Sequence, residues 1–139
     1  MTVLDAVGVV TELNRRFRGG DAAGAFALFD PAIRIEQPAS LPHGGAHLGH
    51  DGVARMGAAF AEHWTRTIDA PRIHGSGSHG TGSPVTQLTT QTWTAKSTGR
   101  AATVDVVELI TVTDGLVTEI RVFQQDTHAL LATLPGGQG

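Results

Sequence analysis

Two turn signals divide the C-terminal half of the chain into three long segments of strand type, and these segments constrain the fold most. The segments cover residues 84–97, 101–113 and 116–125 and are rich in Thr, Val and Leu. Thr98-Gly99-Arg100 and Asp114-Gly115 stand between them, and short connections that contain glycine are typical of β-hairpins. The sequence therefore predicts an antiparallel meander of three strands.

Helical patterns fill much of the first half of the chain. Apolar residues at three- and four-residue spacing predict a first helix, which ends at Gly19-Gly20. Asp21 caps a second, shorter helix over residues 22–29, and Asp51 caps a third helix, since a short polar side chain satisfies the first free N–H groups. A last short helix is expected over residues 127–134.

Short strand patterns over residues 32–37 and 68–74 complete the predicted elements. Helices come first and an antiparallel meander follows, which is an α+β order. We expect a cone-shaped α+β barrel, in which a strongly curved, mixed or antiparallel sheet and three N-terminal helices enclose a mostly apolar pocket. The domain is expected to cover residues 1–134, and residues 135–139 are expected to form a flexible tail.

Composition narrows the classes of function. A chain of 139 residues suits one domain with a core of its own. The absence of Cys excludes disulfides, thiolate metal sites and a Cys nucleophile. A net charge of -3 argues against a nucleic-acid partner, which would need a basic face. The start lacks the basic residues of a secretory signal and no apolar run approaches the roughly 20 residues that cross a bilayer, so we expect a cytoplasmic protein without a membrane partner.

Several local motifs follow one another along the chain. They are Phe17-Arg18-Gly19-Gly20-Asp21, Ile35-Glu36-Gln37-Pro38, Ser40-Leu41-Pro42-His43-Gly44-Gly45 and the closing run over residues 114–127. In this order they resemble the nuclear transport factor 2-like superfamily, in particular its SnoaL-like and ketosteroid isomerase-like branch. The resemblance implies a pocket between the helices and the concave side of the sheet. Members use this pocket for isomerisation, aldol cyclisation, dehydration or epoxide opening, or only for binding.

The same resemblance argues against one mechanism. Steroid isomerases place a general base, an Asp, immediately before the Pro of the first strand, where this sequence has Gln37. Their two oxyanion donors, a Tyr and a protonated Asp, match Leu13 and Val107. An amide takes no proton at neutral pH, and hydrocarbon side chains donate no hydrogen bond. We therefore do not expect a steroid isomerase.

Asp105 is the first candidate general base. The matching points Val107 into the pocket, and strand alternation then sorts its neighbours. The inward set is Thr103, Asp105, Val107 and Leu109, and the outward set is Val104, Val106 and Glu108. A lone carboxyl on an apolar face would be desolvated, which raises its pKa and suits a general base. The alternative is that Asp105 lies in water near a strand end or pairs with Arg100.

Asp126 is the second candidate base. The resemblance implies an acid near this end of the pocket, because several cyclases and hydrolases of the superfamily have one there. The alternative needs no catalysis, since an Asp directly before Thr127 is a good N-cap for the last helix. Both roles are compatible.

Histidines are the candidate partner acids, since imidazole exchanges protons near neutral pH. His43 lies with His47 and His50 in a Gly-rich loop over residues 39–52. Their irregular spacing does not fit a metal site, and no metal is expected. His63 lies on the apolar face of the third helix, where it is a pocket acid or a buried, hydrogen-bonded core residue.

Apolar and amide side chains are expected to bind the substrate. Trp64 is also explained by core packing alone. Gln91 and Trp93 share one strand face, but the sequence does not say which face lines the pocket, because a one-residue slip reverses every side chain. The predicted binding residues are Gln37, Phe60, Trp64, Gln91, Trp93, Val107, Val122 and Gln124.

Three functional hypotheses follow. The first is a cofactor-independent enzyme of the SnoaL-like type, acting by general acid-base catalysis on a small hydrophobic carbonyl, hydroxy or epoxide compound. The second is a non-catalytic protein of the same fold that binds a small hydrophobic ligand. The third is association through the outer sheet face, which is expected to carry Val104, Val106 and Phe123 and to form a homodimer or bind another chain. A homodimer is compatible with either of the first two.

Overall fold

The computed structural model describes residues 5–75 and 84–136. Residues 137–139 of the predicted tail therefore lie outside the described residues. The helices are α1 (Ala6–Arg18), α2 (Ala22–Phe26), α3 (Gly49–His63) and α4 (Thr127–Leu131). The strands are β1 (Phe29–Gln37), β2 (Gly45–Leu48), β3 (Trp64–Ile68), β4 (Arg72–His74), β5 (Pro84–Ala95), β6 (Ala101–Thr113) and β7 (Leu116–Gln124).

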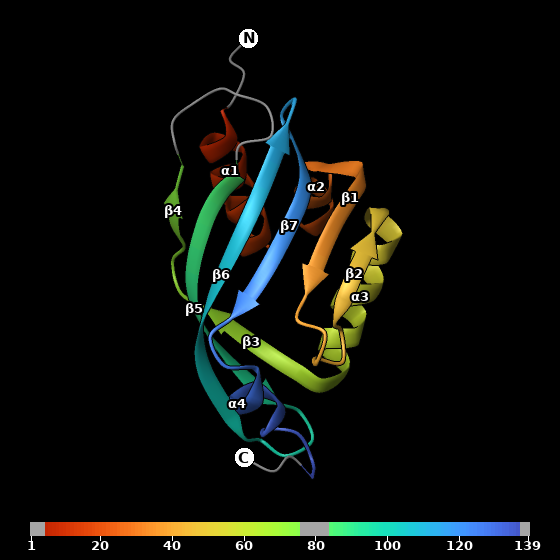
Figure 1. Cartoon of the computed structure of the whole chain (residues 1–139), viewed down its shortest axis with the longest axis vertical. Helices are drawn as coiled ribbons and strands as arrows, with labels where there is room; N and C mark the ends of the chain where they lie inside the picture. The colour runs from red at the N-terminus through yellow and green to blue at the C-terminus, as the bar shows by residue number, and fades with distance from the viewer. Residues whose placement is uncertain (1–4, 76–83, 137–139) are drawn as a thin grey trace.

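The strands form one sheet in the order β2-β1-β7-β6-β5-β3, and β4 also pairs with β5. The pair β1–β7 is parallel, and the other pairs are antiparallel. In Figure 1 the long strands β5, β6 and β7 curve across the front, while α1 and α2 lie behind them. This curved, mixed sheet with helices on one side confirms the predicted α+β cone.

The meander matches its prediction closely. β6 runs from Ala101 to Thr113, as expected, and pairs along most of its length with β5 and β7. Asp114 and Gly115 both have positive φ, at 53° and 78°. Positive φ at two central residues gives the tight hairpin turn that fits the twist of the flanking strands, and Asp and Gly tolerate it. The turn residues therefore fix both strand ends.

Several boundaries differ from the predictions. The second helix ends at Phe26, the first strand already begins at Phe29, and the last helix ends at Leu131. The third helix begins at Gly49, so Asp51 lies in its first turn and does not cap it, and it ends at His63, where Trp64 begins β3. The expected strand over residues 68–74 is replaced by β3 and β4, and the expected loop over residues 39–52 contains β2. The β-branched residues of β3 gain backbone hydrogen bonds by pairing with β5, which outweighs the helical spacing of the apolar residues.

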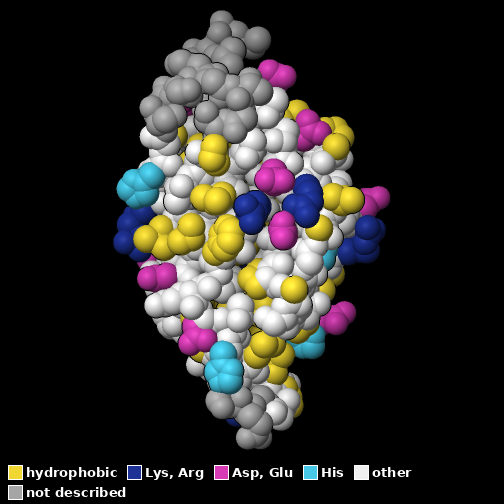
Figure 2. Space-filling model, in the orientation of Figure 1, with side chains coloured by type: hydrophobic (Ala, Val, Ile, Leu, Met, Phe, Trp, Pro, Cys, Tyr) yellow, Lys and Arg dark blue, Asp and Glu magenta, His cyan; other side chains and the backbone are white. Residues whose placement is uncertain are grey.

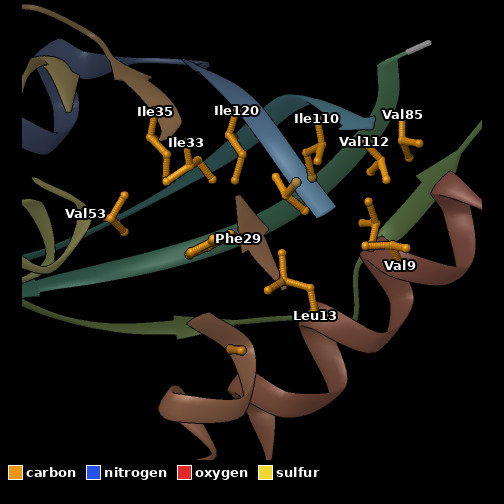
Figure 3. Packing of buried hydrophobic residues seen from close by; sticks show 13 residues of the cluster. Val9, Leu13, Phe29, Ile33, Ile35, Val53, Val85, Ile110, Val112 and Ile120 are labelled. Atoms are coloured by element: carbon orange, nitrogen blue, oxygen red, sulfur yellow. The ribbon is translucent and has the colours of Figure 1, made fainter. Parts of the chain in front are cut away.

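Two clusters of buried apolar side chains form the core. In the first, Val9 and Leu13 of α1 pack against the concave face of the sheet, where Ile110 and Ile120 lie (Figure 3). The second lies around Trp64, whose indole N–H donates to Thr133 Oγ1 at 2.8 Å. Helix α1 thus closes the concave side of the sheet.

Membrane-crossing helices are not found in the described ranges, where every helix is too short or too polar for that role.

Candidate functional site

A cavity of about 550 Å³ opens between the helices and the concave sheet face. Its volume is within the range of small-molecule sites, roughly 300 to 1,000 Å³. Side chains from α1, α3 and five strands line it. The apolar wall comprises Leu13, Phe29, Ile35, Val53, Met56, Ile110, Ile120 and Val122. Val122, one of the predicted binding residues, is part of this wall.

Among the described residues, Glu108 is the one residue of the cavity lining that carries a carboxyl group. It stands in the inward row of β6, whose other members are apolar and nearly inaccessible: Val104, Val106, Ile110 and Val112. Burial raises the pKa of Glu108, while a hydrogen bond from Gln87 and the charge of Arg66 act in the opposite direction. Burial is the largest of these effects, so the protein favours the neutral carboxyl.

The predicted orientation of β6 is wrong by one residue. Val107 and Asp105 belong to the opposite row from Glu108 and take no part in the cavity lining. The Asp105 carboxylate accepts a hydrogen bond from Thr90 Oγ1 at 2.7 Å instead. The assignment started from a single matched position, and strand alternation carried that one-residue error along the whole strand. Val107 therefore no longer argues against a steroid isomerase. The other two arguments, Gln37 in place of the general base and Leu13 in place of an oxyanion donor, still hold.

A chain of two amides holds Glu108. Asn14 Nδ2 donates to Val10 O at 3.0 Å and to Gln87 Oε1 at 2.6 Å. Because both Asn14 hydrogens have acceptors, the amide oxygen of Gln87 must face Asn14 and its nitrogen must face the cavity. Gln87 Nε2 then donates to Glu108 Oε1 at 3.2 Å. Helix α1 thereby orients the carboxyl group on β6.

The structure settles which face of β5 looks inward. Gln91 is buried and lines the cavity, and the buried Trp93 lies on the same face. Gln91 is fixed from both sides, since its Nε2 donates to Thr89 Oγ1 and its Oε1 accepts from Trp93 Nε1, each at 2.9 Å. Gln91 thus lies in the wall, while Trp93 supports it from the core.

Gln37 is the least satisfied polar group of the lining. Its Nε2 lies 3.5 Å from Met56 Sδ, and its buried Oε1 has no partner among the described residues. A buried acceptor without a donor is costly. Gln37 is therefore suited to accept a hydrogen bond from a bound molecule.

The mouth of the cavity is marked by its exposed lining residues. Phe17 and Ile68 are exposed to 45% and 43%, large fractions for apolar side chains. Arg18 and Arg66 are exposed beside them on α1 and β3. The cavity thus opens between the end of α1 and β3, with apolar and cationic groups at its rim.

His43, the predicted acid, lies in the second core cluster. Gly44 keeps its loop tight, because a Cβ there would lie 2.5 Å from the Pro38 carbonyl oxygen. His43 is only 4% exposed, and its ring lies 5.4 Å from Phe60 and 5.7 Å from Trp93. Burial lowers the pKa of His43 to about 4, and nearby positive charges add to the effect.

His43 is thus a neutral core residue outside the cavity lining, as are its neighbours Phe60 and Trp64. The remaining predicted residues also lie elsewhere. His63 is half-buried at the end of α3, and the exposed Asp126 caps α4 by accepting from Ala129 N at 3.0 Å. The capping role expected as the alternative for Asp126 is therefore present.

Gln124 lines a second hollow of about 340 Å³ at the ends of β1 and β7. Its buried Oε1 lacks a partner in the described part of the chain. Gln37 and Val122 line both hollows. Across residues 5–75 and 84–136, no three His, Asp or Glu side chains are grouped so as to hold a metal ion.

Comparisons with known proteins agree with this architecture. The family model described as the SnoaL-like domain matches residues 10–120. An NTF2-like protein of Burkholderia xenovorans is 28% identical with a TM-score of 0.77, over 94% of this chain and 95% of that one. TerC, co-crystallised with polyporic acid, is 25% identical with a TM-score of 0.75, over 88% of this chain and 92% of that one. No curated protein matches the chain.

Proposed function

The chain belongs to the SnoaL-like domain family, and we propose that it is a cofactor-independent enzyme in which Glu108 is the general acid-base group. The substrate is a small hydrophobic carbonyl, hydroxy or epoxide compound. The apolar wall supports a hydrophobic substrate, and the single carboxyl supports proton transfer. The relative crystallised with polyporic acid supports an organic ligand in this fold.

One carboxyl group suffices for a complete proton cycle. The neutral Glu108 gives its proton to the substrate oxygen, which becomes a hydroxyl group or leaves as water. The resulting carboxylate then takes a proton from a carbon atom of the same substrate and returns to its starting state. Dehydration and epoxide opening to an unsaturated alcohol fit this sequence without a second catalytic group. Isomerisation of a carbonyl compound needs two rounds: the first gives the enol, and in the second Glu108 gives its proton to a different carbon atom and takes back the proton of the enol hydroxyl.

The observation that carries the proposal is the position of a lone carboxyl, which Gln87 holds by a hydrogen bond, in the lining of an apolar cavity; burial there raises the pKa of Glu108. A raised pKa moves the carboxyl toward the working pH, where a group both accepts and donates protons efficiently. Asn14 and Gln87 also line the cavity, and we assign them a positioning role because their hydrogen bonds hold the carboxyl of Glu108. Gln37 offers its free acceptor to a substrate hydroxyl.

The test follows proton exchange, so it needs no knowledge of the natural substrate. 1-Tetralone and similar apolar ketones in D₂O lose the hydrogens beside the carbonyl, which proton NMR detects. We expect the protein to accelerate this exchange and Glu108→Gln to reduce the acceleration by about 100-fold or more. Glu119→Gln, which removes a half-exposed carboxylate from the outer face, is the matched control. Equal acceleration by the Glu108 variant and the wild type would refute the assignment.

One observation favours the alternative function. Among the described residues, neither a histidine nor a second carboxyl lines the cavity. A non-catalytic protein that stores a small hydrophobic ligand has the same apolar wall and needs no acid-base pair. Mass spectrometry of a solvent extract of the purified protein distinguishes the two. An unchanged ligand, together with no Glu108-dependent exchange, supports binding alone.

We also propose that the outer sheet face forms a homodimer. Val104 and Val106, expected on this face, are in the core, and Val107 and Leu109 take their place. Phe123 is 45% exposed on the adjacent strand. Figure 2 shows this face, where hydrophobic side chains lie beside arginine and carboxylate groups. The face carries two arginines and two glutamates, which are Arg34, Glu36, Glu119 and Arg121. Because both signs are present in equal number, the positive groups of one copy can meet the negative groups of an identical copy.

A further inference from the structure

The charges around the cavity do not balance. Three ionisable side chains line it, Arg18, Arg66 and Glu108. In the described ranges no carboxylate lies within 4.0 Å of either guanidinium, although Glu12 and Glu36 pair with other arginines. Two guanidinium groups therefore stand against one carboxyl group, and the lining carries a net positive charge whether Glu108 is ionised or neutral.

The positive charges are concentrated at the mouth. Both arginines are exposed, while Glu108 stands in a row of buried side chains on β6. The Arg66 guanidinium lies 4.6 Å from the centre of the Phe60 ring, which holds the charge beside the opening. Phe17 and Ile68 add exposed apolar surface to the same rim. The rim therefore offers both apolar contact and bidentate donors for an oxyanion.

We propose that the cavity takes an amphipathic organic anion, whose apolar body fills the interior and whose carboxylate or other oxyanion lies at the mouth with Arg18 and Arg66. This inference rests on the proposed function and names the substrate class of the same site.

The test compares two probes of nearly equal shape, 2-naphthoate and 2-naphthamide, by isothermal titration calorimetry. We expect the wild type to bind the anion at least about fivefold more tightly than the amide, the ratio that one partly exposed charge pair supplies. The double variant Arg18→Gln with Arg66→Gln should lose this preference. Arg66→Lys should retain part of it, since the charge remains.

Arg55→Gln is the matched control, because Arg55 is an exposed arginine of α3 outside the cavity lining. It removes one positive charge, half the change made by the double variant, and should leave the preference intact. Equal affinity for the two probes in the wild type, no binding of either, or an unchanged preference in the double variant would overturn the inference.

Failure of the proposed function would look different. Glu108→Gln removes the acid-base group but neither arginine, so it should keep the preference for 2-naphthoate while losing the catalysed exchange. A wild type that prefers the anion but accelerates no exchange refutes the catalytic role alone. A wild type that accelerates exchange without preferring the anion refutes the substrate class alone.

Discussion

His43 should make the protein sensitive to acid. The folded state keeps the imidazole neutral within the aromatic cluster, and its pKa falls from the usual 6.5 to about 4. In the unfolded chain the same ring is in water and binds a proton near its usual pKa. Between these values the unfolded state therefore binds more protons than the folded state, so the stability from His43 is lost as pH falls.

The magnitude follows from the two pKa values. One pKa unit corresponds to about 1.4 kcal/mol, so the free energy of unfolding should fall by about 3 kcal/mol between pH 7 and pH 4 through this residue. The contribution is complete above pH 6.5. The side chain is only 4% exposed, so solvent screening reduces the effect little.

His43→Phe isolates this contribution, because phenylalanine keeps an aromatic ring in the cluster and does not titrate. Urea unfolding, followed by the fluorescence of the buried Trp64 and Trp93, gives the free energy of unfolding at each pH. The difference between wild type and variant removes all other titrating groups. We expect this difference to change by about 3 kcal/mol from pH 7 to pH 4 in favour of the variant. Parallel pH curves for the two proteins would show that His43 does not titrate differently in the folded and unfolded states.

Three further predictions use the same preparations. Glu108→Gln should stabilise the protein more at pH 7 than at pH 4.5, because the raised pKa of the wild-type carboxyl makes its ionisation more costly in the folded than in the unfolded state; urea unfolding at the two pH values measures it, and a pH-independent difference would contradict it. Trp64→Phe should lower the free energy of unfolding by about 2 kcal/mol, since it leaves a void and removes the bond to Thr133; an unchanged urea midpoint would contradict this. Val107→Glu should convert a dimer into a monomer in light scattering, and a wild type already monomeric at micromolar concentration would exclude the proposed dimer.

The strands and turns of the meander could be predicted from the sequence because turn-forming residues stand at the ends of the strands. Asp114 and Gly115 accept the positive φ that the turn needs, so both ends of the hairpin are visible in the sequence. The boundary between α3 and β3 could not be predicted in this way, because His63 and Trp64 both fit the apolar spacing of the helix. Only pairing with β5, a segment far along the chain, shows that Trp64 starts a strand.

The inward orientation of Glu108 could have been predicted from the sequence of β6 alone. Glu108 shares one face of the strand with four apolar residues, which are Val104, Val106, Ile110 and Val112. This apolar row marks the face as inward, whichever residue a relative has at the position of Val107. The supporting amides were not readable. Asn14 and Gln87 are 73 residues apart, and one sequence does not show that they touch. The position of Arg66 in the cavity lining could not be predicted, because the strand was expected to begin at residue 68 and β3 begins at Trp64.

Glu108 should be a carboxyl with a raised pKa inside a mostly apolar cavity. Carbon-13 NMR of the side-chain carboxyl across pH 3 to 9 tests this directly, with Glu108→Gln identifying the resonance. We expect a titration midpoint clearly above the usual 4.5, and a shift of that midpoint when 2-naphthoate binds. A midpoint at or below 4.5, unaffected by the probe, would contradict it.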